Sequence, residues 1–158
     1  MKEMNLKSVG VVKRTGDGFV IKVDKAYKAG LRGLEGFGHV NVLWWFSKCD
    51  DLVARSVLET ERPYRDGPDR LGVFASRSPE RPNPIALTVS EVMDINYETG
   101  EVHIAFIDAE DGTPVLDIKP YIPSFDRVMT PRVPRWQGGW PMSSEESGSF
   151  DWNDVFNF

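Results

Sequence analysis

The sequence contains little of what several common kinds of site require. Cys49 is its one cysteine, and it has two histidines among 158 residues. One thiol cannot build a disulfide framework or a four-cysteine zinc site, so we expect no metal and a reducing environment. His39 and His103 cannot complete a zinc site with that thiol, and we expect each to be a strand residue with local partners.

Long apolar runs are also absent. No stretch approaches the roughly 18 residues of a membrane span, and residues 1–10 lack the apolar segment of a secretory signal. We therefore expect a cytoplasmic protein with no membrane contact. The sequence has no GxGxxG after a strand, no Walker loop, no HExxH and no GxSxG, which removes the common nucleotide-binding, metalloprotease and serine-hydrolase motifs.

The charge balance is mildly acidic, with 24 Asp and Glu, 19 Lys and Arg and a net charge of −5. Such a chain is not expected to coat nucleic acid nonspecifically, because phosphate binding needs excess basic side chains. Residues 143–158 hold four acids and no base, so the remainder is close to neutral and has room for a local basic patch. The length fits one domain with its own core.

Glycine and proline, 14 and 11 residues, divide the chain into the short segments typical of all-β domains. The main expected strands are residues 9–12, 19–23, 39–46, 71–75, 85–93 and 102–107. Other expected segments are a hairpin turn at 15–18, loose helical turns at 25–34, a long loop at 50–68 and an irregular stretch at 120–134.

Six or seven strands are most simply closed as a barrel, because closure removes sheet edges. The predicted fold is mainly β, a closed antiparallel barrel with one or two short helices. The barrel domain is expected over residues 1–140. Residues 141–158 form an acidic, aromatic tail that either docks on its own body or a second subunit, or is disordered.

Residues 77–84 hold two arginines and three prolines. Prolines fix φ, and a stiff loop can hold a ligand without the entropic cost of ordering. Arg77 and Arg81 offer planar charged groups suited to carboxylate or phosphate, and Asn83 an amide that can read a base edge or cap a turn. The residues are equally compatible with a rigid structural crossover in which the arginines pair with acids such as Glu80.

Residues 111–123 form a second distinctive segment. Asp117 and Lys119 alternate with apolar residues, which puts both charges on one side of an extended strand. They form either a surface ion pair of little energetic weight or, together with Tyr121, part of a cavity wall.

At these two segments the sequence resembles the TsaA-like, or TrmO-type (YaeB), family of S-adenosylmethionine-dependent methyltransferases. The shared strings are Arg-Ser-x-x-Arg-Pro-Asn-Pro-Ile, beginning at Arg77, and Asp-Ile-Lys-Pro-Tyr, beginning at Asp117. A third block covers residues 30–39 and is followed by Trp44-Trp45-Phe46. The similarity extends over residues 9–123 and implies a β-barrel in place of a Rossmann sheet.

The resemblance implies a short-form homodimer that binds S-adenosylmethionine and methylates the exocyclic amine of threonylcarbamoyl-adenosine beside the tRNA anticodon. The cofactor contacts that it implies are Phe46, Ser47, Lys48, Arg77, Leu87, Phe106, Ile107 and Asp108. We nominate Asp108 or Asp117 as the catalytic carboxylate that stabilises the positive charge of the sulfonium and of the departing proton. The expected substrate contacts are Arg81, Asn83, Lys119 and Tyr121.

The sequence departs from the family pattern at Ser47, where histidine is usual, and at Ala86, where glycine is usual. The family's Pro-Arg-Gln stretch has no counterpart in residues 13–18, and we expect no C-terminal tRNA domain. Two alternatives therefore stand beside the tRNA methyltransferase: a small-molecule methyltransferase on the same scaffold and a non-catalytic S-adenosylmethionine-binding module. If tRNA is the substrate, the expected phosphate and base contacts are Arg127, Arg132, Arg135, Trp136 and Trp140.

Overall fold

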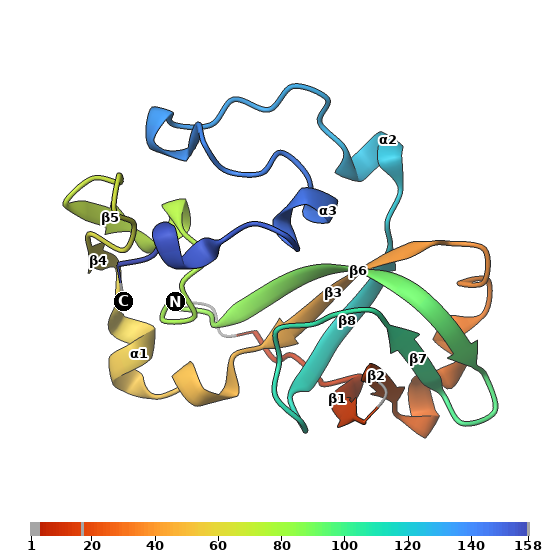
Figure 1. Ribbon diagram of the computed structural model, residues 1–158. Coiled ribbons are helices and arrows are strands. Elements are labelled where there is room, and N and C mark those ends of the chain that lie inside the picture. The colour runs from red at the N-terminus through yellow and green to blue at the C-terminus, as the bar shows by residue number, and fades with distance from the viewer. Residues whose placement is uncertain (1–3, 17, 158) are drawn as a thin grey trace. The chain divides into compact units, whose positions relative to one another are not determined.

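The computed structural model describes residues 4–16 and 18–157, which form two compact units (Figure 1). The first unit comprises Met1–Asp50 and Pro84–Arg127, and the second Asp51–Asn83 and Val128–Phe158. This division differs from the expected one at residue 140, because the long segment after β3 groups with the C-terminal segment and not with the barrel. Among the described residues, no helix has the length and hydropathy to cross a membrane.

Six antiparallel strands of the first unit close into a barrel in the order β1-β2-β7-β6-β3-β8. The strands are β1 (Gly10–Thr15), β2 (Gly18–Val23), β3 (His39–Trp45), β6 (Ile85–Asn96), β7 (Glu101–Ile104) and β8 (Pro114–Pro120). The helices of this unit are η1 (Lys25–Leu31), η2 (Ser47–Cys49) and α2 (Pro123–Asp126). The predicted closed antiparallel barrel is confirmed.

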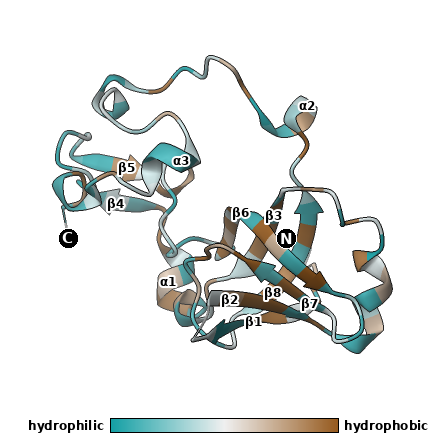
Figure 2. Cartoon of the chain, turned by 45° about the vertical axis from the view of Figure 1, so that its right-hand side comes forward, coloured by the Kyte–Doolittle hydropathy of each residue, from teal (hydrophilic) through white to brown (hydrophobic). Residues whose placement is uncertain are grey.

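The barrel is filled by β-branched side chains at alternating strand positions. The fully buried ones, each 0% exposed, are Val12, Ile21, Val40, Val42, Val102 and Val115. Each contributes roughly 1.5–3 kcal/mol on leaving water. The hydropathy colouring places brown apolar positions along the barrel strands (Figure 2). The buried indole of Trp44 donates to the Thr88 hydroxyl at 3.0 Å, which satisfies its polar atom inside the barrel.

The hairpin of β1 and β2 brings two backbones very close together. A Cβ on Gly10 would lie 2.3 Å from the carbonyl oxygen of Lys22, so only glycine fits there. The expected hairpin of these strands is confirmed by their antiparallel pairing, although Asp17 of the expected turn lies outside the described residues. Helix η1 confirms the expected loose helical turns.

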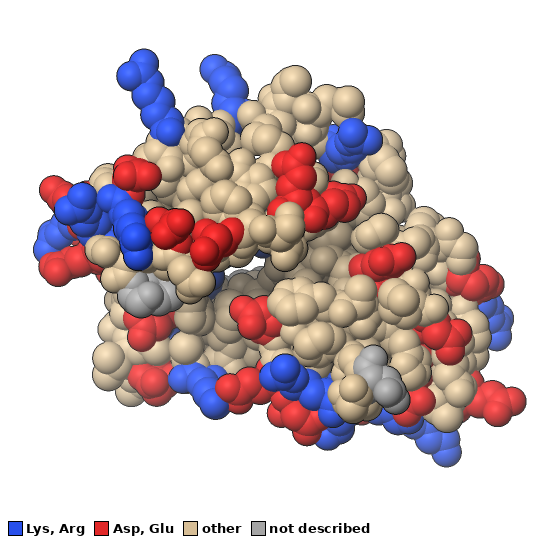
Figure 3. All heavy atoms as spheres, in the orientation of Figure 1, with Lys and Arg blue, Asp and Glu red and all other residues tan. Residues whose placement is uncertain are grey.

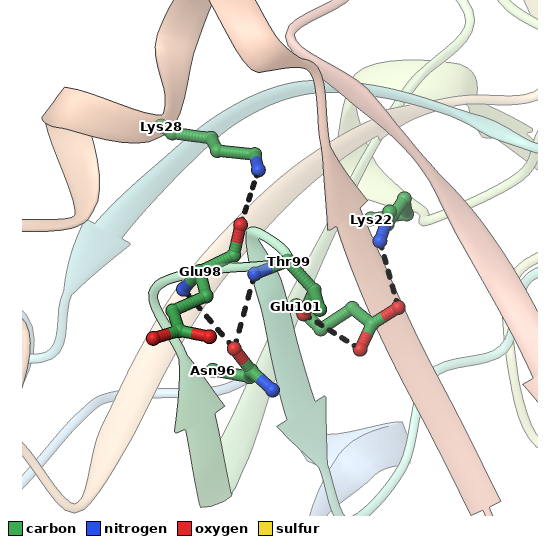
Figure 4. A network of polar contacts seen from close by, with 6 residues as sticks. All are labelled: Lys22, Lys28, Asn96, Glu98, Thr99 and Glu101. Carbon is green, nitrogen blue, oxygen red and sulfur yellow. Dashed lines mark hydrogen bonds and ion pairs between the residues drawn. The ribbon is translucent and has the colours of Figure 1, made fainter.

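The hairpin between β6 and β7 is held by polar contacts of six residues (Figure 4). Asn96 Oδ1 accepts the backbone N–H groups of Glu98 and Thr99, both at 3.0 Å. Glu101 pairs with Lys22 of β2 at 2.8 Å, and this contact, together with the Thr99 hydroxyl, holds the pKa of Glu101 below its usual value. The network fixes the turn and its neighbour β2, so we assign it a structural role.

The second unit contains short elements. They are α1 (Leu52–Ser56), β4 (Glu59–Glu61), β5 (Arg70–Gly72), η3 (Val73–Ala75), η4 (Arg135–Gln137), α3 (Ser144–Ser147) and η5 (Trp152–Asp154). The expectation of a long loop at residues 50–68 is wrong. Asp51 caps α1 by accepting the N–H groups of Val53 and Ala54, and β4 pairs with β5. The strand expected at 71–75 ends at Gly72, where η3 begins.

Candidate functional site

Three of the expected cofactor contacts follow β3 directly. Phe46 packs edge-to-face on Trp44 at 4.6 Å and donates its N–H to the carbonyl of Pro84 at 2.8 Å. These contacts fix the chain where it leaves the barrel wall. Ser47 and Lys48 then begin η2 and are exposed to solvent.

The segment after β7 lies at the same end of the barrel, and its side chains are exposed and buried in alternation. Ile107 and Ala109 are buried in the barrel core, whereas Phe106, Asp108 and Glu110 are exposed. The alternation turns these three side chains toward solvent because successive residues of extended backbone point in opposite directions.

An ion pair joins the two segments. Lys48 Nζ lies 2.6 Å from Glu110 Oε1, and both side chains are exposed. Exposed ion pairs add little stability. This ion pair is useful because it shows which segments of the chain lie close together. It shows that the segments after β3 and after β7, about 60 residues apart in sequence, meet at one end of the barrel.

Phe106 presents an aromatic surface at this end. Its side chain is 58% exposed and contacts Phe19 edge-to-face at 5.7 Å, while the Arg14 guanidinium lies 5.3 Å from the Phe19 ring centre. The strand expected over residues 102–107 stops at Ile104. Beyond this end, the Ala105 N–H donates to the Glu91 carbonyl at 3.0 Å and the Phe106 N–H to the side-chain hydroxyl of Ser90 at 3.1 Å.

A second group of expected residues lies on the outer face of the barrel. Leu87 of β6 and Asp117 of β8 both pair with Leu43 of β3, and directly opposed residues share a face. Two strand spacings place Leu87 and Asp117 roughly 10 Å apart. The Leu87 side chain is 45% exposed, which makes this row accessible.

The expected carboxylates differ in their surroundings. Asp117 accepts from Lys119 Nζ at 2.7 Å and from the backbone N–H of Ile118 at 2.9 Å, and the Asp117 contact raises the pKa of Lys119. Asp108 has no hydrogen bond or ion pair with any residue that the structure describes. The arrangement therefore leaves Asp108 available to a ligand and commits Asp117 to its surface pair.

Tyr121 follows β8 and lies beside β3. Its ring packs edge-to-face on His39 at 6.3 Å, and its N–H donates to the His39 carbonyl at 2.9 Å. Nearby, the buried side chain of Asn41 donates to Asp126 at 3.2 Å, which ties α2 to the barrel wall. Lys119 pairs with Asn41 on this outer face, so Lys119 and Tyr121 are supported by the same two strands.

The proline-rich arginine segment belongs to the second unit. The Arg81 guanidinium donates to three carbonyls of its own loop: Ser78 at 2.7 Å, Ser76 at 2.7 Å and Val73 at 3.0 Å. Among the described residues, Arg81 thus bonds to backbone carbonyls of its own loop in place of an acidic side chain. We call these three hydrogen bonds the Arg81 clamp. Arg81 holds the loop in shape, while Arg77 and Asn83 on the same loop are exposed.

The predicted residues thus fall into three groups. The barrel end holds Phe46, Ser47, Lys48, Phe106, Ile107 and Asp108. The outer barrel face holds Leu87, Asp117, Lys119 and Tyr121. The second unit holds Arg77, Arg81 and Asn83.

Sequence reasoning missed other members of the barrel end. Glu110 meets Lys48, and the Arg14–Phe19 pair lies beside Phe106. The alternation of apolar and polar residues in 107–110 was a usable signal for Glu110. Nothing in the local sequence predicted the contact of Phe19 with Phe106, because it depends on the pairing of β2 with β7.

Comparison with known proteins gives a consistent result. The family described as tRNA-methyltransferase O N-terminal domain matches residues 10–127. An S-adenosyl-L-methionine-binding protein of Archaeoglobus fulgidus is 39% identical over 108 residues, which cover 68% of this chain and 72% of that protein. The human tRNA (adenine(37)-N6)-methyltransferase is 42% identical over 104 residues, covering 64% of this chain and 22% of the human protein.

A solved structure has a similar fold. The crystal structure of TrmO from Pseudomonas aeruginosa aligns with a TM-score of 0.65 and 26% identity over 85% of this chain and 62% of that one. The chain spans under two thirds of this bacterial protein and about a fifth of the mammalian relatives. The family resemblance predicted from the sequence motifs is confirmed: the chain belongs to the family of the tRNA-methyltransferase O N-terminal domain.

Proposed function

We propose that this chain is an S-adenosylmethionine-dependent tRNA methyltransferase that acts on the N6 atom of an adenosine next to the anticodon. The family match and the relatives named tRNA (adenine(37)-N6)-methyltransferase support the reaction, and the relatives named S-adenosyl-L-methionine-binding proteins support the cofactor. Threonylcarbamoyl-adenosine is the acceptor that the sequence resemblance implies.

The observation that carries the proposal is the meeting of residues 46–48 and 106–108 at one barrel end. Both segments were assigned to the cofactor from sequence, and the 2.6 Å contact of Lys48 with Glu110 brings them together. The barrel interior is filled by apolar side chains, so we place the ligand at the barrel end.

The side chains at this end suit the chemistry of S-adenosylmethionine. Exposed Phe106 offers an aromatic face to an adenine ring, and the carboxylate of Asp108, which has no partner among the described residues, suits a cationic sulfonium. Arg77, on the second unit, is the arginine that the sequence resemblance assigns to the cofactor, and its guanidinium suits a carboxylate. When bound, the cofactor supplies an activated methyl group.

The chain's own contribution is to orient the acceptor and to stabilise charge. As N6 gains a methyl group it loses a proton, and positive charge develops at that nitrogen. The Asp108 carboxylate is the group placed to favour this charge. Lys119, Tyr121 and Asn83 are proposed to contact the acceptor, and the Arg81 clamp keeps the Arg77 loop in shape.

The test is methyl transfer from labelled S-adenosylmethionine to purified tRNA, followed by nuclease digestion and nucleoside analysis. We expect label in N6-methylated adenosine, with threonylcarbamoyl-tRNA the better acceptor. Label in a fraction of small metabolites and not in tRNA would contradict the proposal and favour the small-molecule enzyme. The homodimer and the cytoplasmic location stay predictions.

A non-catalytic binding module is the second candidate. The names of the archaeal relatives, which mention binding of S-adenosyl-L-methionine and no reaction, favour it. Tight binding of the cofactor in calorimetry without transfer to any acceptor would select this candidate.

A further inference from the structure

The C-terminal segment makes specific contacts within the second unit, beyond residues 10–127 that match the family. Phe156 forms an antiparallel bridge with Tyr64. Arg65 donates its backbone N–H to Val155 at 3.0 Å and its Nε–H to Phe156 at 3.2 Å. Asn157 donates to the carbonyls of Arg62 and Pro63, both at 3.1 Å.

These contacts surround one tyrosine. Tyr64 is 9% exposed and lies at the centre of an aromatic cluster. Trp136 stacks on it at 5.1 Å, Trp140 meets it edge-to-face at 5.1 Å, and the Phe156 ring lies 5.8 Å away. The cluster continues from Trp140 to Trp152 at 5.4 Å. The tail aromatics therefore hold Tyr64 in one position, because the three rings in contact with it leave it little freedom.

The hydroxyl of Tyr64 reaches the arginine loop. The backbone N–H of Arg77 donates to the Tyr64 hydroxyl oxygen, and the Arg77 charge acts on the same group. Burial raises the pKa of the Tyr64 hydroxyl, although the Arg77 contacts oppose this, so the hydroxyl stays protonated at neutral pH. The loop is thus supported from two sides, by the Arg81 clamp and by Tyr64.

We infer that the C-terminal aromatic segment positions Arg77 through Tyr64. In this arrangement Tyr64 is a positioning residue: it touches the backbone of Arg77 and acts on a ligand only through that arginine. The inference rests on the proposed function, in which Arg77 contacts S-adenosylmethionine. Residues 128–158 then contribute to cofactor affinity without touching the cofactor.

The experiment compares three variants with the unmodified protein. Tyr64→Phe removes the hydroxyl and keeps the ring, and Phe156→Ala removes part of the support behind it. Tyr97→Phe is the matched control, because it also deletes one phenol hydroxyl, at a tyrosine that bonds to Glu35 on the barrel unit.

The first readout is hydrogen exchange of residues 76–78 without cofactor. Loss of one hydrogen bond should speed this exchange about fivefold in Tyr64→Phe, and Phe156→Ala should do the same. The second readout is the Kd for S-adenosylmethionine from calorimetry, which should rise about fivefold in both variants and stay unchanged in Tyr97→Phe. Tryptophan emission should respond to the cofactor, since Trp136 stacks on Tyr64.

The outcomes separate the two proposals. Unchanged exchange and unchanged Kd in Tyr64→Phe, with normal binding by the parent protein, would overturn the positioning role and leave the proposed function intact. Absence of cofactor binding by the parent protein would overturn the proposed function, and with it the role of Tyr64 toward the cofactor. Faster exchange in Tyr64→Phe would then show that the contact with the loop is real.

Discussion

At the scale of single residues, the two candidate carboxylates have opposite surroundings. Asp117 is bonded to Lys119 and to its own strand, whereas Asp108 faces solvent without a partner among the described residues. A carboxylate that already pairs with one cation stabilises a second cation less strongly. The structure therefore favours Asp108 as the residue that stabilises charge during methyl transfer.

This difference predicts unequal effects of two matched substitutions. Asp108→Asn should lower kcat/KM for methyl transfer on the order of 10²-fold, because it removes a charge placed at the reacting centre. Asp117→Asn should change kcat/KM by less than about threefold, as expected for an exposed surface pair. Steady-state kinetics with labelled cofactor would measure both. The reverse order of effects would assign the catalytic carboxylate to Asp117.

Asp51 is a second residue with a clear physical role. Its carboxylate accepts two N–H groups at the start of α1, and these bonds hold its pKa below the usual value of 3.8. Because the folded-state pKa is the lower one, the stabilisation is present above pH 3.8 and is lost as the pH falls through the folded-state pKa.

Asp51→Ala should therefore lower the melting temperature at pH 7 by about 2–4 °C. The difference from the parent protein should shrink as the pH falls through the folded-state pKa of Asp51, which lies below 3.8, because the parent then loses its charged cap as well. Asp66→Ala, which removes an exposed aspartate from the same unit, is the control and should leave the melting temperature unchanged. A difference that persists at low pH would mean that Asp51 acts by packing and not by its charge.

At the scale of elements, the shape of the proline-rich arginine loop depends on the Arg81 side chain, which lysine cannot replace. Arg81 reaches three carbonyls with its planar fork of N–H groups. Lysine keeps the charge but has one compact ammonium group that cannot span them. The element thus owes its shape to Arg81 as well as to its prolines.

Arg81→Lys should speed hydrogen exchange in residues 73–83 about tenfold, since it releases carbonyls of Val73 and Ser76. Mass spectrometry of peptic fragments would measure this exchange. Arg132→Lys, at an exposed arginine of the same unit, provides the control and should show no change. Equal exchange in Arg81→Lys and the parent protein would mean that the prolines hold the loop unaided.

Elements with strong local signals were predictable from the sequence. The consecutive apolar residues of β3 and the turn between β1 and β2 were recognisable from residue type, and the barrel follows from closing the strands. Helix α1 was missed because five residues give little periodicity, although the Asp51 cap was a usable signal. The sequence also predicted a longer β7; beyond its end, the Phe106 N–H bonds to the Ser90 side chain of another strand, a contact that local sequence does not reveal.

The candidate site was predictable where the motifs are local. The arginine loop and the Asp117–Lys119 pair were recognisable from spacing, and the pair is confirmed at 2.7 Å. The contact of Lys48 with Glu110 and the packing of Phe156 on Tyr64 were not predictable, because they join segments far apart in the chain. Long-range pairing sets such contacts, and local composition carries no information on it.

At the scale of the whole molecule, charge bears on the proposed substrate. The net charge is −5, and basic and acidic side chains are interspersed on the face shown in Figure 3. Binding of tRNA must therefore use a few local basic side chains. The exposed arginines Arg127, Arg132 and Arg135 remain the predicted phosphate contacts.

Three phosphate contacts predict a measurable salt dependence. The affinity for tRNA should fall about 20-fold between 50 and 200 mM salt, and replacing the three arginines by glutamine should remove most of this dependence. Fluorescence anisotropy with labelled tRNA would measure it, with cofactor affinity of the triple variant as the control for folding. A salt dependence that survives the triple substitution would place the tRNA contacts elsewhere.

The most direct test of the central claim is a crystal structure of this chain with S-adenosylmethionine bound. We expect electron density for the cofactor at the barrel end, in contact with Phe106 and Asp108. Density at another part of the molecule, with the barrel end open to solvent, would contradict it.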